Sequence, residues 1–180
     1  MTRTSEEIVR FEFNRKRYAW GVFTAVAMAT FVGSGATTAL AQGIKDIPLT
    51  ASQNPSGTDL PFSQAVWAGD TLYVSGWLDP DLKTHTDTAS QTAGILKDIQ
   101  TFLKTQHLTM GDVAMVRVYL AADPAKGGQM DLSGFRAGYH PFFGTKDQPN
   151  KPACTTVEVV LPAGRRGALV EIDVVAMRSK

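Results

Sequence analysis

The chain has a single cysteine, Cys154, so no disulfide can form within one copy. Its three histidines, His85, His107 and His140, lie in separate segments without the spacing of a metal site, and we expect neither a metal nor another cofactor. The sequence contains no phosphate-binding loop, nucleophile elbow or dinucleotide-binding fingerprint. These absences exclude the common templates for nucleotide-dependent, serine-hydrolase and zinc chemistry.

The chain also lacks an excess of charge of either sign, with 18 basic and 17 acidic residues. Beyond residue 41 it carries 13 basic and 14 acidic residues. Proteins that bind a phosphate backbone concentrate lysine and arginine on one face. The near-neutral composition therefore predicts no nucleic-acid partner.

Long apolar runs are missing except at residues 18–32, near the N-terminus. Arg15, Lys16 and Arg17 precede this run, and the small residues Ala39 and Ala41 follow it. This order is typical of a signal peptide, here residues 1–41, and predicts a periplasmic or secreted protein. The alternative, an uncleaved membrane anchor, needs roughly 20 apolar residues. We therefore expect no stable membrane insertion after cleavage.

The remaining chain divides into two parts. Residues 42–60 are rich in proline, serine, threonine and glycine without periodicity, which predicts an extended arm or linker. Residues 61–180 are expected to form one α+β domain, because hydrophobic residues make up 43% of the chain and can build one core.

Local patterns predict the elements of this domain. A hairpin is expected at residues 64–75 with its turn at Gly69, followed by a polar loop at residues 79–86. Thr88 and Gln91 form a predicted capping box for a helix whose apolar positions recur from Ile95 to Leu103. Residues 113–120 alternate as a strand that places Val116, Val118 and Leu120 on one face.

A second helix is expected from Leu132, with Pro141 kinking or splitting it near His140 and Gly144 as its C-cap. Residues 153–161 and 168–177 are expected to form a closing hairpin. The predicted order is ββαβαββ, a sheet with both helices on one face. The uncovered face predicts a homo-oligomer.

Three side chains of the last strands are candidates for chemistry. Glu171 and Asp173 share a face of the final strand, which is either solvated or lines a subunit cleft where a carboxylate activates water. Cys154 is either a small buried hydrophobic residue or a nucleophile that lacks an adjacent base.

The order and spacing of several motifs across residues 61–178 resemble the RidA/YjgF family, also called the endoribonuclease L-PSP family. The residues that carry this resemblance are Pro61-Phe62-Ser63-Gln64-Ala65-Val66, Gly69-Asp70-Thr71-Leu72-Tyr73-Val74-Ser75-Gly76, Gln91-Thr92 with the predicted helix at residues 95–103, the predicted strand at residues 113–120, Tyr139, Phe142-Phe143-Gly144, Pro152-Ala153, Thr155-Thr156-Val157-Glu158-Val159 and Val170-Glu171-Ile172. The resemblance implies a chorismate-mutase-like fold and a homotrimer with a central β-barrel and ligand clefts between subunits.

The resemblance also implies a reaction, because known members hydrolyse reactive enamines and imines, such as 2-aminoacrylate and its imino tautomer, to the keto acid and ammonia. Glu171 matches the family glutamate that orients water. Phe62 stands where many members have a tyrosine, and Gly76 matches a glycine of the first cleft wall. We expect Phe62, Gly76, Cys154 and Thr155 to line the substrate site. Cys154 falls where the family has a carboxylate-binding arginine. A charge-assisted hydrogen bond contributes roughly 1.5–3 kcal/mol, so its loss predicts an altered substrate unless Arg117, Arg165 or Arg166 reaches the cleft.

Three functions follow as expectations. The first is a RidA-like deaminase that hydrolyses a small imine, enamine or related metabolite. The second is a trimer that binds a small molecule without converting it. The third is an endoribonuclease, which the near-neutral charge disfavours.

Overall fold

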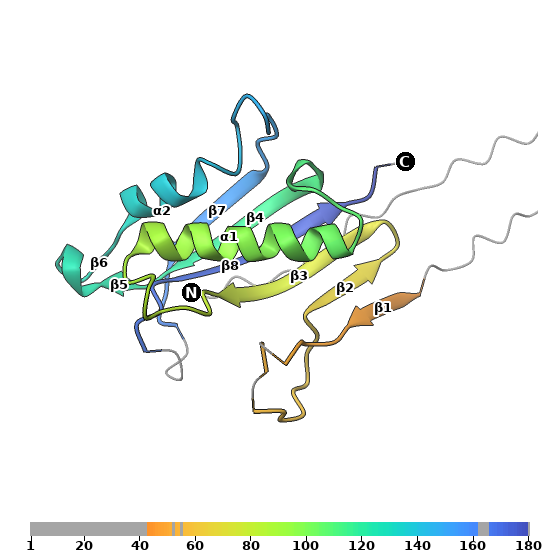
Figure 1. The fold of residues 1–180 in the computed structure, drawn as a ribbon, viewed down its shortest axis with the longest axis horizontal. Helices are drawn as coiled ribbons and strands as arrows, with labels where there is room; N and C mark the ends of the chain where they lie inside the picture. Colours follow the sequence, from red (N-terminus) through yellow and green to blue (C-terminus); the bar gives the residue numbers. More distant parts are fainter. Residues whose placement is uncertain (1–42, 52, 55, 162–165, 180) are drawn as a thin grey trace, which may run out of the picture. The chain divides into compact units, whose positions relative to one another are not determined.

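The computed structural model describes residues 43–179 except 52, 55 and 162–165. Its main elements follow the predicted order: β2 (Ala65–Ala68), β3 (Thr71–Leu78), α1 (Thr88–Thr105), β4 (Val113–Leu120), α2 (Leu132–Tyr139), β7 (Ala153–Glu158) and β8 (Val170–Met177). The predicted α+β class and ββαβαββ order are confirmed, and both helices cover one face of the sheet (Figure 1). The predicted leader lies outside the described residues.

Short elements complete the fold. They are β1 (Ile44–Ile47), the 3-10 helices η1 (Met110–Asp112) and η2 (Pro124–Lys126), and a small hairpin of β5 (Ala122–Asp123) with β6 (Gln129–Met130). Strand β1 belongs to the segment expected as an extended arm, and it pairs antiparallel with β2. Part of the arm is therefore an edge strand of the main sheet. No helix in the described ranges is long and apolar enough to cross a membrane.

The main sheet has six strands in the order β1-β2-β3-β8-β4-β7. The β2–β3 hairpin is confirmed, and Gly69 in its turn has a φ of +64°, which favours glycine. The predicted closing hairpin is wrong. Strand β8 lies between β3 and β4, antiparallel to both, while β7 pairs parallel with the other edge of β4. Because β7 and β8 lie on opposite sides of β4, they are not neighbours in the sheet and cannot form a hairpin.

Helix α1 begins one residue earlier than its predicted capping box. Asp87 is the N-cap, and its carboxylate accepts hydrogen bonds from the backbone N–H groups of Ala89 and Ser90, both at 2.9 Å. Ser90 completes the box. Gln91 is instead fully buried, and its amide bonds to backbone groups outside the helix. The predicted apolar face from Ile95 to Leu103 is buried as expected.

Helix α2 is shorter than the predicted apolar pattern. It ends at Tyr139 with His140 as the C-cap, directly before Pro141, as the lost backbone donor of proline predicts. Gly144 is therefore not the C-cap. It lies in the following loop with a φ of +72°. Gly138 allows close packing of the two helices, because a Cβ there would overlap the carbonyl oxygen of Ala89.

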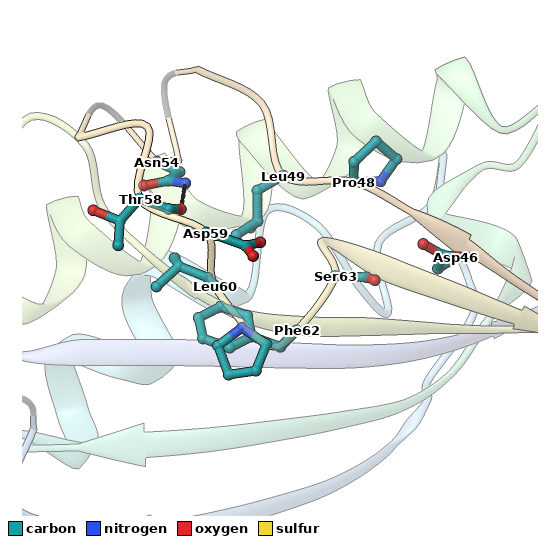
Figure 2. Close-up of a pocket in the computed structure, with 10 residues that line it drawn as sticks. Asp46, Pro48, Leu49, Asn54, Thr58, Asp59, Leu60, Phe62 and Ser63 are labelled. Carbon is teal, nitrogen blue, oxygen red and sulfur yellow. Dashed lines mark hydrogen bonds between the residues drawn. The ribbon is translucent and has the colours of Figure 1, made fainter.

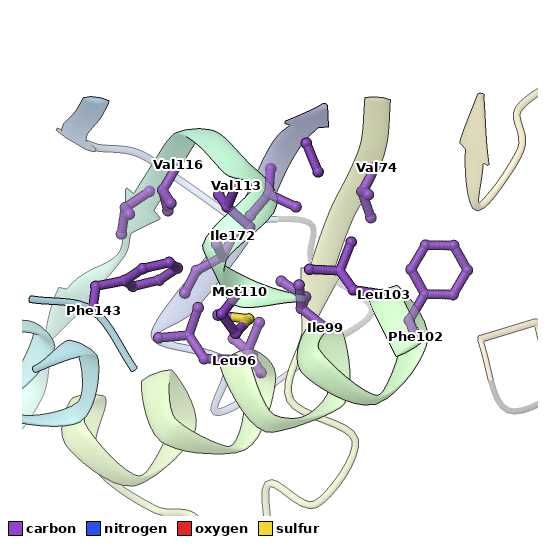
Figure 3. Close-up of a cluster of buried hydrophobic side chains, with 14 of the residues drawn as sticks. Val74, Leu96, Ile99, Phe102, Leu103, Met110, Val113, Val116, Phe143 and Ile172 are labelled. Atoms are coloured by element: carbon purple, nitrogen blue, oxygen red, sulfur yellow. The ribbon is translucent and has the colours of Figure 1, made fainter. Parts of the chain in front are cut away.

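The hydrophobic core fills the space between the helices and the sheet. Leu96, Ile99 and Leu103 of α1 meet Val116 of β4 and Ile172 of β8, all fully buried (Figure 3). Burying side chains of this size contributes about 1.5–3 kcal/mol each. The core thus fixes which side chains of β4 and β8 point away from the helices.

The face of the sheet opposite the helices carries exposed apolar groups. Tyr73 is 49% exposed, Val157 42% and Met177 51%. Tyr73 lies opposite Val175, and Met177 lies opposite Thr71. This face, called the open face below, also carries Arg117, Tyr119, Glu171 and Asp173.

Candidate functional site

Glu171 lies near the start of β8 on the open face. It pairs with Leu78 of β3 on one side and with Tyr119 of β4 on the other. Its neighbours in sequence, Val170 and Ile172, point into the core and are fully buried. The alternation of the strand therefore holds the carboxylate at the open face while its backbone is fixed by the core.

Gly76 provides the space for this carboxylate. A Cβ at residue 76 would overlap Oε1 of Glu171. The register of β3 against β8 shifts between Val74 and Trp77, so Gly76 lies at an irregular point of the strand. Any larger side chain at Gly76 would displace the Glu171 carboxylate. The structure thus brings together two residues that the sequence had assigned to one site.

Asp173 and its two partners form the second part of the site. Arg117 donates a hydrogen bond from Nε to Oδ1 of Asp173 at 2.6 Å, and the Tyr119 hydroxyl donates to Oδ2 at 3.0 Å. The hydrogen bond to Asp173 raises the pKa of Arg117, which stays charged. Burial and then the same carboxylate raise the pKa of the Tyr119 hydroxyl, which stays protonated as a donor.

The pKa of Glu171 is raised above its ordinary value. Partial burial is the larger cause, and the negative charge of Asp173 is the smaller one. Glu171 forms no ion pair in the described ranges. A carboxylate with a raised pKa is a better proton acceptor when ionised, which suits general base catalysis.

These groups surround a pocket of about 280 Å³. Glu171, Asp173 and Tyr119 line its polar side. Gly76 lies beside Glu171, and the remaining lining is apolar, from Val159, Val160 and Leu161. The pocket is large enough for a small organic molecule and for a water molecule beside Glu171.

Thr155 lies on the open face, at the exposed edge strand β7, opposite Arg117. Cys154 points to the other face, because it pairs with Val116, whose side chain lies in the core. Within one chain, Cys154 and Glu171 therefore face opposite sides of the sheet. Cys154 is exposed, so it is not the buried hydrophobic residue that one alternative expected.

The Cys154 thiol has a raised pKa. Partial desolvation is the main cause, and the contact with the Thr156 hydroxyl at 4.0 Å acts in the opposite direction. A raised pKa leaves less of the reactive thiolate at neutral pH. The nucleophile alternative for Cys154 gains no support from its surroundings.

Phe62 does not line the Glu171 pocket but a separate hollow of about 390 Å³ formed by the arm (Figure 2). Its side chain is 58% exposed. Asp46, Asn54 and Asp59 are among the polar residues around this hollow. In one chain, the Glu171 pocket therefore contains Gly76 but neither Phe62 nor Cys154.

Two polar clusters were missed from the sequence. Tyr119 and Arg117 alternate with core residues in β4, but their bonds to Asp173 depend on β8 lying beside β4. In the loop before α1, Asp79 is fully buried and its Oδ2 lies 2.7 Å from Nδ1 of His85. Gly94 of α1 leaves room for this pair. The described residues contain no group of three side chains arranged to hold a metal.

Comparison with known proteins identifies the family. Residues 53–178 match the family model described as Endoribonuclease L-PSP. The chain belongs to this family. A RutC family protein of Sulfurisphaera tokodaii is 37% identical to this chain over 124 residues. The match covers 66% of this chain and 88% of the relative. A RutC family protein of Saccharolobus solfataricus is 36% identical over the same shares of the two chains.

Solved structures of similar proteins share the fold. A protein of the conserved Rid family from Yersinia pestis is 28% identical and superposes with a TM-score of 0.57, covering 76% of this chain and 100% of that chain. A Pseudomonas aeruginosa protein of unknown function gives a TM-score of 0.60 at 24% identity, covering 75% and 92%. The resemblance to the RidA/YjgF family is thereby confirmed.

Proposed function

We propose that the chain hydrolyses a small imine or enamine to a carbonyl compound and ammonia, with Glu171 directing the attacking water. The observation that carries this proposal is the Glu171 carboxylate, which lines a pocket, has a raised pKa and forms no ion pair in the described ranges. Membership of the endoribonuclease L-PSP family supports it. The near-neutral charge disfavours RNA as the substrate.

The proposed reaction needs one group that both accepts and returns a proton. Ionised Glu171 accepts a proton from water as the water oxygen bonds to the imine carbon. Glu171 then returns this proton to the nitrogen, which gives the neutral carbinolamine. As the C–N bond breaks and the C=O bond forms, the hydroxyl proton of the carbinolamine passes through Glu171 to the departing ammonia. The balance is one imine and one water giving one carbonyl compound and one ammonia, without a cofactor.

We also propose that the working form is a homotrimer. The apolar groups of the open face, Tyr73, Val157 and Met177, are the surfaces that such an assembly would cover. Cys154 and Glu171 face opposite sides of one sheet, so they can share a cleft only if they come from different copies. The leader predicted at residues 1–41 further supports a proposed export to the periplasm or the medium.

Glu171→Gln tests the role of the carboxylate. Ammonia and carbonyl release from imines generated in situ should exceed the uncatalysed rate with the wild-type protein and fall by about 10²-fold or more in this variant. Glu158→Gln is the matched control, because Glu158 is an exposed glutamate that accepts a hydrogen bond from Met130 N–H and does not line the Glu171 pocket.

The pH dependence follows from the raised pKa. Wild-type activity should fall as the pH drops through the pKa of Glu171, which lies above the ordinary 4.5, because the protonated acid cannot accept a proton from water.

Equal rates for wild type and Glu171→Gln would reject the role of Glu171 in directing water. A ligand that raises Tm while no imine is consumed would favour the binding function instead.

A further inference from the structure

The pocket around Glu171 has an unusual charge balance for a site that binds imino acids. Its lining holds two carboxylates, Glu171 and Asp173, and neither lysine nor arginine among the described residues. A substrate carboxylate entering this pocket would therefore meet like charge.

Arg117 does not supply a positive charge for a substrate carboxylate in this pocket. Its Nε already donates to Asp173 at 2.6 Å, and Asp173 also accepts from Tyr119. The positive charge of Arg117 thus offsets the negative charge of Asp173. Glu171 is left as the carboxylate of the pocket without an opposite charge in the described ranges.

The other wall of the pocket is apolar. Val159, Val160 and Leu161 line it, and Val160 is 99% exposed at the rim. Such a wall suits an alkyl or aryl group, and a cation suits the unpaired Glu171. A protonated imine with an apolar substituent and no carboxylate combines both features.

We propose that this pocket selects iminium ions without a carboxylate, the class formed when amines are oxidised, over the 2-imino acids formed when amino acids are oxidised. This inference rests on the proposed hydrolytic function. The reaction converts one iminium ion and one water into one carbonyl compound and one ammonium ion. The C–O bond forms, the C–N bond breaks, and no oxidant or reductant is needed.

Two imines that differ only in the carboxylate test the inference. A flavin amine oxidase acting on 2-phenylethylamine supplies one, and an amino acid oxidase acting on phenylalanine supplies the other. Each is generated in the presence of the wild-type protein, and the imine that survives is trapped as its semicarbazone. We expect kcat/KM to be at least about tenfold higher for the amine-derived imine, because like charge at a binding site discriminates strongly between ligands.

Val160→Arg adds a positive charge at the rim of the pocket. Val160 is 99% exposed, so this substitution should change the stability of the fold little. It should raise kcat/KM for the 2-imino acid and reduce the ratio between the two substrates, whereas Val160→Gln, the uncharged control, should leave the ratio within about twofold. An equal or higher wild-type kcat/KM for the 2-imino acid would overturn the selectivity while hydrolysis stands. An unchanged ratio in Val160→Arg would also overturn it. If the wild type accelerates neither imine, the hydrolytic function itself is rejected.

Discussion

Glu171 owes its position to the absence of a side chain at Gly76. The carboxylate is anchored through a backbone between two core residues, but its free end lies where a Cβ of residue 76 would be. Glu171 has flexible side-chain torsions, so it can move away from an added methyl group without disrupting the core. A change at Gly76 should therefore alter catalysis more than folding.

Gly76→Ala is expected to lower kcat/KM for imine hydrolysis by roughly 10- to 100-fold, because displacing a catalytic group by about 1 Å costs up to about 10² in rate. Gly43→Ala is the control, since a Cβ at Gly43 meets no atom within 4 Å. Steady-state rates and Tm of both variants are the measurements. Activity of Gly76→Ala at the wild-type level would show that the Glu171 carboxylate need not stay where the structure places it.

At the scale of elements, helix α1 holds the beginning of β8 in place through Gln91. The amide of Gln91 donates to the carbonyl of Gly167 at 2.8 Å and to that of His85 at 3.1 Å, and it accepts from Leu169 N–H at 2.8 Å. Glu171 follows two residues after Leu169. The buried glutamine therefore connects the helix to the strand that carries the candidate catalytic group.

Gln91→Leu should lower the free energy of unfolding by about 2–4 kcal/mol, because it leaves the buried Leu169 N–H and other backbone groups without partners. Gln100→Leu, on the same helix at a half-buried position, should change it by less than about 0.5 kcal/mol. Urea unfolding measures both. Equal stabilities of the two variants would mean that the hydrogen bonds of Gln91 contribute little.

The local elements were predictable because their signals are local. The apolar spacing of α1, the alternation of β4 and the effect of Pro141 each depend on residues close in sequence. The α1 cap was misplaced by one residue because Asp87 and Thr88 are both good caps, with Ser90 and Gln91 three residues beyond. The structure decides between them by using the Gln91 side chain in tertiary contacts.

The pairing of β8 was not predictable in the same way. Strands β7 and β8 are neighbours in sequence, which favours a hairpin, yet β8 pairs with β3 and β4. The residues of β8 do not predict which strands will lie beside it in the sheet. For the same reason, Glu171 could be selected as a candidate from the sequence, whereas the bonds of Asp173 to Arg117 and Tyr119 could not.

At the scale of the whole molecule, the open face leaves apolar side chains exposed to solvent in a single chain. It combines exposed Tyr73, Val157 and Met177 with the pocket that contains Glu171. Covering these apolar groups with further copies would also exclude water from the pocket, and a lower dielectric strengthens the electrostatic interactions inside it. The proposed assembly and the proposed chemistry therefore depend on each other.

The solution mass of the purified protein tests this dependence most directly. Sedimentation equilibrium at the concentrations used for the activity assay should give three times the mass of one chain, because the open face is expected to be buried between copies. A stable monomer at those concentrations would contradict the account, since the Glu171 pocket would then remain an open hollow on a single sheet.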